Sequence, residues 1–295
     1  MRTVSCTLII WAAFALPSGR AAADQASAHL HKAMAHKKEG KADEAIAELK
    51  KALEQREAYA AAHHSLGMLY REKGELPKAI QHLERAAQLE PKSAMLHYSL
   101  GITYFKADRK QDALRSLTEA ARLDPKDVQV QAQLGVLLIR TDPQKAIPYL
   151  EAAVKLKPEH PDYAHQLGLA YRRTSANLTA PTQAKQRDDY LRRAERYFLK
   201  AAEKKESAEL EFDLGALYRR LDKVDEAIKH YEKAIQLKPK MAAAHWDLGH
   251  MYVKAKRNDE AIESYKQYLK LAGEGAKDAD IAKKRIKELK GSKKK

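Results

Sequence analysis

The sequence has 295 residues, of which 44% are hydrophobic, 32% are charged and one is a cysteine. The hydrophobic content is too high for a chain that is disordered throughout, and a single cysteine excludes a fold held by internal disulfides. The formal net charge is +15, and nine of the lysines and arginines fall in the last 19 residues. The excess positive charge is therefore concentrated at the carboxyl end.

Residues 1–23 have the composition of a cleavable secretory signal. A basic end precedes a mostly apolar run over residues 4–16, and Ala21 and Ala23 offer a small-residue cleavage site. The run is shorter than the about 20 residues that a membrane-spanning helix needs. We therefore expect cleavage near Ala23 and a periplasmic or secreted mature protein without Cys6. An uncleaved signal kept as an anchor is the alternative.

The rest of the chain repeats one short motif, Leu-Gly-x-x-Tyr or a close variant of it. The glycine is followed by an alanine, a large apolar residue and a second alanine, as in Gly67, Ala79, Leu83 and Ala86. Residues three or four apart share one face of a helix, so this spacing predicts two helices in close contact through small side chains. Glycine costs about 1 kcal/mol inside a helix, and we expect close packing to offset it. The motif glycines are Gly67, Gly101, Gly135, Gly168, Gly215 and Gly249.

The spacing between copies is 34 residues, apart from one of 33 and one of 47. With prolines such as Pro91 and Pro125 at the ends of units, the pattern resembles the tetratricopeptide repeat over about residues 26–272. The resemblance implies an all-α fold, a right-handed superhelical solenoid of about seven antiparallel helix pairs plus a C-terminal capping helix. The expected parts are a solenoid over 24–272, with units near 26–59, 60–93, 94–127, 128–160, 161–207, 208–241 and 242–272, and a capping helix with a basic tail over 273–295.

Several positions depart from the family pattern. The usual tryptophan, three residues before the leucine, is replaced by His29, His63, His97 and His245, which we expect to pack between helices. Pro148 should disturb the first turn of its helix. The 47-residue spacing implies an insertion near 174–187, expected as a surface loop before a helix over 188–204. The insertion either has only a structural role or contacts a partner. In the capping helix, Ile281, Ile286 and Leu289 should share one face.

No motif for catalysis is present. The sequence has no HExxH, no glycine-rich phosphate loop, no Gly-x-Ser-x-Gly and, after cleavage, no cysteine nucleophile. His31 and His36, like His245 and His250, are five residues apart, whereas a helical zinc pair is typically four apart. We therefore expect no enzyme activity, no cofactor and no metal.

The resemblance implies a concave groove lined by the first helix of each unit. Apolar and aromatic side chains there are the candidate anchors for a bound peptide, and a row of basic residues runs beside them. The anchors are Met34, Met68, Tyr98, Ile102, Phe105, Val136, Ile139, Leu169, Phe212 and Trp246. The basic row is Lys37, Arg71, Lys106, Arg140, Arg172, Arg173, Arg219, Arg220 and Lys254. The basic row also fits the last turn of each first helix, where the helix dipole favours cations.

The predicted function is a non-catalytic scaffold in the cell envelope that binds peptide segments of partner proteins in the groove. Some family members hold a C-terminal carboxylate with lysine and asparagine. Here Leu30, Met34, His64 and Met68 take those places, so that clamp is not expected. The alternative is an anchoring protein whose lysine-rich tail binds anionic envelope polymers or lipid head groups. Nucleic-acid binding fits the charge but not the export signal.

Overall fold

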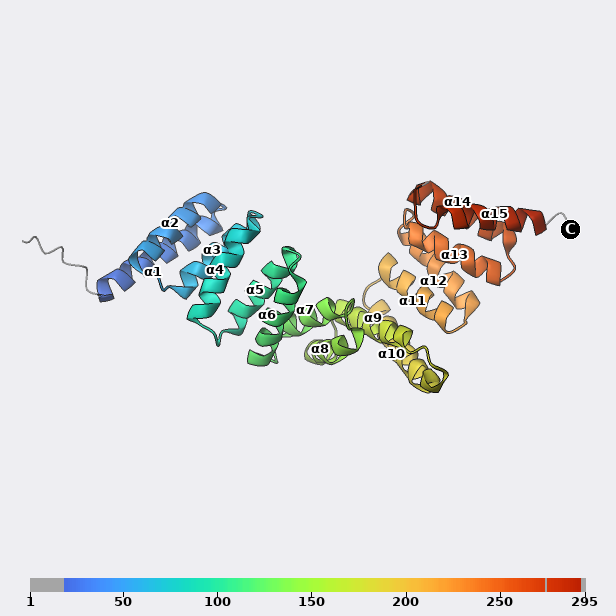
Figure 1. Ribbon diagram of the computed structural model, residues 1–295, viewed down its shortest axis with the longest axis horizontal. Coiled ribbons are helices and arrows are strands. Elements are labelled where there is room, and N and C mark those ends of the chain that lie inside the picture. The colour runs from blue at the N-terminus through green and yellow to red at the C-terminus, as the bar shows by residue number, and fades with distance from the viewer. Residues whose placement is uncertain (1–18, 274, 293–295) are drawn as a thin grey trace, which may run out of the picture. The chain divides into compact units, whose positions relative to one another are not determined.

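The computed structural model describes residues 19–273 and 275–292, so most of the predicted signal and the last three lysines lie outside the described residues (Figure 1). In the described part, 15 α-helices and one short 3-10 helix occur without any β-strand. The all-α prediction is confirmed. The chain divides into two compact units, over residues 1–123 and 124–295.

Each unit is built from antiparallel helix pairs, in which an odd-numbered helix up to α13 packs against the even-numbered helix that follows it. In the first unit the helices are α1 (Gly19–Lys38), α2 (Ala42–Gln55), α3 (Ala60–Glu72), α4 (Leu76–Leu89), α5 (Ala94–Lys106) and α6 (Lys110–Leu123). In the second unit they are α7 (Val128–Leu138), α8 (Pro143–Leu156), α9 (Pro161–Asn177), η1 (Pro181–Gln183), α10 (Ala184–Ala202), α11 (Ala208–Arg220), α12 (Val224–Leu237), α13 (Ala242–Lys254), α14 (Asn258–Ala272) and α15 (Ala279–Ser292). We call the odd-numbered members of these pairs the first helices.

The motif glycines lie where the two helices of a pair touch. A Cβ atom on Gly67 would lie 2.5 Å from Cγ of Leu83, and one on Gly215 would lie 2.7 Å from the ring of Tyr231. Both distances are too short for a real contact, so any larger residue would push the helices apart. The glycine therefore recurs because the same close contact is built in each pair.

The side chains that replace the family's tryptophan tie each pair to the turn before it. Nε2 of His63, His97 and His245 donates to the carbonyl of the residue six positions earlier, at distances of 2.9 to 3.1 Å. Gln131, at the same position in its unit, makes the equivalent bond to Pro125. His29 instead bonds Glu48 on the partner helix. The histidines thus join helices and turns, in line with a packing role.

A second recurring contact joins successive pairs. The hydroxyl of a first-helix tyrosine donates to a glutamate 20 residues earlier, on the second helix of the preceding pair. This contact links Tyr104 with Glu84, Tyr171 with Glu151 and Tyr252 with Glu232. Burial, with a smaller contribution from Glu151, raises the pKa of Tyr171 to about 12. The hydroxyls therefore stay protonated and remain donors.

The insertion lengthens two helices and leaves only a short loop. α9 continues to Asn177 and α10 begins at Ala184, so the expected loop over 174–187 is wrong at both ends. Thr174 and Ser175 are buried, and their hydroxyls donate to backbone carbonyls one turn earlier, at 2.9 and 2.7 Å. These bonds satisfy the buried hydroxyls within the helix, which explains why α9 does not end there.

Two smaller expectations are also corrected. α8 runs without a break through Pro148, whose ring is exposed, and its first turn is capped by Asp142, which accepts from the backbone of Lys145 at 3.1 Å. Ile281 does not lie on the buried face of α15: its side chain is 47% exposed, whereas Ala279 and Ala282 are buried. Small residues at the contact let α15 lie close to α14.

Candidate functional site

The first helices of neighbouring pairs lie side by side and make one face in each unit. In the first unit α3 contacts α5, and Lys37 of α1 bonds Glu72 of α3 at 2.9 Å. In the second unit α11 contacts both α9 and α13. We call these two surfaces the first-helix faces, because the predicted anchors and basic residues all come from first helices or their ends.

On the first unit, Met34 and Met68 meet in one hollow of about 220 Å³ between α1 and α3. Met34 is 56% exposed and Met68 is half-buried. The hollow is mainly apolar, and Lys37 and His64 also line it. Burial lowers the pKa of His64, with smaller contributions from Arg71 and Lys37, so the His64 ring is uncharged at neutral pH, and Lys37 is paired with Glu72. Flexible methionines around an open apolar hollow can adapt to different apolar ligands.

The anchors predicted on α5 differ in exposure. Phe105 is 47% exposed, whereas Tyr98 and Ile102 are half-buried. Of the basic residues on this unit, Arg71 is half-buried and Lys106 is exposed. Nε2 of His64 lies 3.0 Å from the hydroxyl oxygen of Ser99, and this contact joins α3 to α5. The exposed large apolar side chains on the first helices of this unit are thus Met34, Phe105 and Met95, the last of which was not predicted from the sequence.

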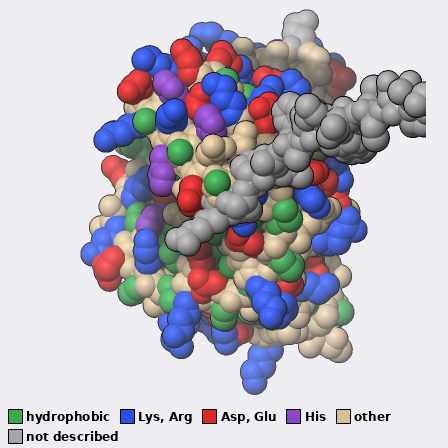
Figure 2. All heavy atoms as spheres, turned by 90° about the vertical axis from the view of Figure 1, so that its left-hand side faces the viewer, with side chains coloured by type: hydrophobic (Ala, Val, Ile, Leu, Met, Phe, Trp, Pro, Cys, Tyr) green, Lys and Arg blue, Asp and Glu red, His purple; other side chains and the backbone are tan. Residues whose placement is uncertain are grey.

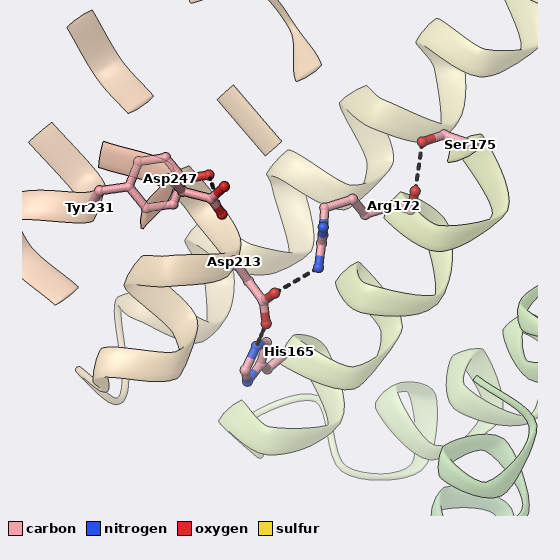
Figure 3. Close-up of polar contacts among 6 residues, drawn as sticks. All are labelled: His165, Arg172, Ser175, Asp213, Tyr231 and Asp247. Atoms are coloured by element: carbon pink, nitrogen blue, oxygen red, sulfur yellow. Dashed lines mark hydrogen bonds and ion pairs between the residues drawn. The ribbon is translucent and has the colours of Figure 1, made fainter. Parts of the chain in front are cut away.

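On the second unit two of the predicted basic residues, Arg172 and Arg219, form ion pairs with the next first helix. One Nη of Arg172 donates to Asp213 at 2.7 Å, and Nε2 of His165 lies 2.8 Å from the other carboxylate oxygen (Figure 3). The carboxylate of Asp213 therefore contacts two side chains of α9, Arg172 and His165, and these contacts link α9 to α11. Arg172 and His165 are both mostly buried, so water screens these contacts weakly.

A second pair continues the arrangement to α13. Arg219 of α11 donates to Asp247 at 2.8 Å, and the hydroxyl of Tyr231 lies 3.5 Å from the other oxygen of that carboxylate. Asp247 is only 9% exposed. Burial raises its pKa, although Arg219 opposes that shift. We call the pairs Arg172–Asp213 and Arg219–Asp247 the polar ladder. Its arginines position first helices, a role that the sequence did not reveal.

The remaining anchors of the second unit are spread between surface and interior. Val136 is exposed, and Leu169 is half-buried. Ile139, at 3% exposure, is in the core and cannot serve as an anchor. The rings of Phe212 and Tyr231 have centroids 5.6 Å apart. Trp246 is half-buried among aromatic rings of its own pair, with centroids 5.0 Å from Tyr268 and 4.5 Å from His250.

The basic row divides into paired and unpaired members. Lys37, Arg172, Arg219 and Lys254 pair with acids, the last with Asp222. Arg140, Arg173 and Arg220 are exposed, and no carboxylate of the described residues lies within 4 Å of their guanidinium groups. On the face drawn in Figure 2, Lys and Arg are interspersed with Asp and Glu, and hydrophobic side chains are scattered among them.

The structure offers no arrangement for metal binding in the described residues, where no group of three or more His, Cys, Asp or Glu could hold an ion. Over the same residues, no helix is long and apolar enough to cross a membrane. Repeated antiparallel helix pairs of this kind define the class of helical repeat proteins, in which stacked units form an extended surface.

Comparisons with known proteins identify the family. Profiles described as "Tetratricopeptide repeat" match residues 26–59, 94–127 and 242–274, and one described as "TPR repeat" matches 67–108 and 215–256. The chain belongs to the tetratricopeptide repeat family. Proteins of this family generally bind other proteins, and the fold is typically a non-catalytic scaffold.

Solved structures share the fold. Pseudomonas aeruginosa PilF is 19% identical with a TM-score of 0.58, covering 79% of this chain and 99% of its own. MamA is 24% identical with a TM-score of 0.51, covering 62% and 97%. A tetratricopeptide repeat protein from Parabacteroides merdae is 15% identical with a TM-score of 0.59, covering 90% and 99%. No curated protein matched the sequence. At these identities the likeness extends to the fold alone.

Proposed function

We propose that this chain is a non-catalytic scaffold of the cell envelope that binds segments of partner proteins on its first-helix faces. The observation that carries the proposal is the hollow between α1 and α3, where Met34 and Met68 form an apolar opening of about 220 Å³. An apolar side chain of a partner, entering this hollow, would bury methionine surface that now faces water. Burial of that kind drives most protein association.

The envelope location rests on the amino-terminal pattern. A basic end, a short apolar run and small residues near Ala23 support export with cleavage of a signal, and the first 18 residues lie outside the described structure. Reading the amino-terminal sequence of the purified protein tests this part. Asp24 as the first residue supports export, and an intact Met1 overturns cleavage.

Capture of partners from cell extract tests the binding face. A Met34→Gln/Met68→Gln variant keeps the side-chain lengths and makes the hollow polar. We expect it to fold normally and to lose the partners that the wild type retains. Leu237→Gln is the control, since Leu237 is an exposed apolar residue that lies on a second helix, α12. Equal capture by the hollow variant and the control would contradict the proposal.

A further inference from the structure

The start of α10, which the insertion lengthens, lines a second cavity that the sequence does not predict. Residues from the first two turns of α10 face the end of α11 and the turn after it, and enclose about 520 Å³. Its walls are Arg187, Asp188, Leu191, Arg192, Arg220, Leu221 and Asp222. We call this cavity the arginine pocket. A cavity of about 510 Å³ lies at the equivalent place between α4 and the turn after α5, but its lining contains one arginine, Arg109. Arg187 and Asp188 come from the added start of α10, which the other second helices lack.

The positive charge of the arginine pocket is poorly neutralised. Asp222 already bonds Lys254, and the nearest contact of Arg187 with Asp188 is a long 3.6 Å. Neither Arg192 nor Arg220 has a carboxylate of the described residues within 4 Å. The pocket thus holds three guanidinium groups and two carboxylates, and one of these carboxylates, Asp222, is already paired with Lys254.

The electrostatics of Arg220 agree with this geometry. Partial desolvation of its guanidinium, together with the charges of Arg172, Arg187 and Arg219, lowers the pKa of Arg220 below its usual range. Arginine remains charged at any physiological pH. Desolvation is the larger cause of the lowered pKa, and the neighbouring positive charges add to it; a bound anion would offset that second contribution.

The floor of the pocket is apolar. Leu191 is buried at 2% exposure, and Leu221 is half-buried. A ligand that fits this surface combines carboxylates with a neighbouring aliphatic side chain. Guanidinium groups bind carboxylates through two parallel hydrogen bonds. Asp188 and Asp222 in the same walls repel any anion, and the repulsion grows with the number of closely spaced charges. It is therefore stronger for the continuous phosphates of a nucleic acid than for a few carboxylates set between aliphatic side chains.

We propose that the arginine pocket binds an acidic stretch of a partner protein. Its carboxylates pair with Arg187, Arg192 and Arg220, and an adjacent aliphatic side chain rests on Leu191 and Leu221. The inference rests on the proposed scaffold function and adds the chemistry of one partner segment. It also gives the insertion a role as a partner contact.

The test uses the full chain and a fluorescent peptide in which pairs of glutamates alternate with leucine. Fluorescence anisotropy measures its affinity for the wild type, for Arg187→Gln/Arg220→Gln and for Arg196→Gln/Lys229→Gln. The last variant loses the same charge at exposed sites without ion pairs among the described residues. We expect the pocket variant to bind at least about tenfold more weakly, as for the loss of one charge-assisted hydrogen bond, and the control variant to bind like the wild type.

Each contrary outcome has a distinct meaning. Equal affinities of the two variants, or equal binding of a peptide with glutamine in place of glutamate, overturns the pocket assignment. Tighter binding of a single-stranded oligonucleotide than of the peptide overturns the choice of a protein ligand. Partner capture through Met34 and Met68 is read separately, so the scaffold function can stand while the pocket assignment fails. Thermal unfolding of each variant checks that the fold is retained.

Discussion

The carboxylate of Asp247 lies in the interior of the second unit and receives the guanidinium of Arg219 at 2.8 Å. The two residues come from successive first helices, α11 and α13, and no other cation of the described residues contacts this carboxylate. Asp247 would otherwise be a buried charge without a partner, which is costly. Arg219 is therefore a structural residue, even though its position in the sequence fits a ligand-binding row.

Replacing Arg219 should destabilise the second unit. We expect Arg219→Met to lower the free energy of unfolding by about 1–2 kcal/mol, because Asp247 loses its partner and the pair is partly exposed. Denaturant titration measures the change. Arg173→Met, at an exposed arginine of α9 without an ion pair among the described residues, is the control and should leave stability nearly unchanged. Equal stability of the two variants would show that the ladder does not hold these helices.

The packing of the motif glycines predicts a second effect. Gly215→Ala should destabilise the protein by about 1–3 kcal/mol, because its Cβ would lie 2.7 Å from the ring of Tyr231. Gly291→Ala introduces the same atom in α15, where nothing lies within 4 Å, and should be neutral or slightly stabilising. Thermal unfolding of both variants gives the comparison. A neutral Gly215→Ala would mean that the helix pair adjusts at little cost.

The turn between the helices of a pair offers a stabilising change. Gly40 and Gly74 have positive φ there, and Asp108, Asp222 and Lys256 hold the same conformation at equivalent positions. A side chain in this region is strained, and glycine is not. We expect Lys256→Gly to stabilise the chain by about 0.5–1 kcal/mol. Lys240→Gly, outside this turn, serves as the comparison. A loss of stability in Lys256→Gly comparable to that in Lys240→Gly would refute the strain.

A histidine pair in the first unit predicts a dependence on pH. Nδ1 of His63 lies 3.0 Å from Nδ1 of His82. Burial lowers the pKa of His82 from 6.5 to about 4, helped by His63 and Lys50, and burial also lowers the pKa of His63, helped by Arg85. The unfolded chain thus binds protons at a higher pH than the folded one, so stability falls as pH falls from about 6.5 to about 4.

The size of that effect is moderate because both rings are partly exposed. We expect a loss of about 1–2 kcal/mol across this range after allowing for screening by water. Denaturant titrations at several pH values measure it, and His82→Gln should flatten the dependence between those limits. The same slope in wild type and His82→Gln would place the titrating group elsewhere.

The sequence predicts contacts within a helix pair better than contacts between pairs. The closeness of Gly67 and Leu83 follows from the helical period, since both positions recur at fixed spacing. The polar ladder could not be predicted, because Arg172 and Asp213 are 41 residues apart while Arg219 and Asp247 are 28 apart. Only the packing of successive first helices brings them together.

The candidate site shows the same limit. Met34 and Met68 were predicted on one face and do line one hollow, whereas Ile139 was predicted there and is buried. A helical position alone does not tell whether a neighbouring helix covers it. The arginine pocket was missed because Arg187 belongs to the insertion, which carries no repeat pattern.

The central claim is that partners bind on the first-helix face of the first unit. A photo-crosslinking amino acid placed at Met68, with the same group at Leu237 as the control, tests it most directly. The account predicts that a discrete partner is crosslinked from position 68 in cells and not from position 237. Crosslinking of the same partner from both positions, or from position 237 alone, would contradict it.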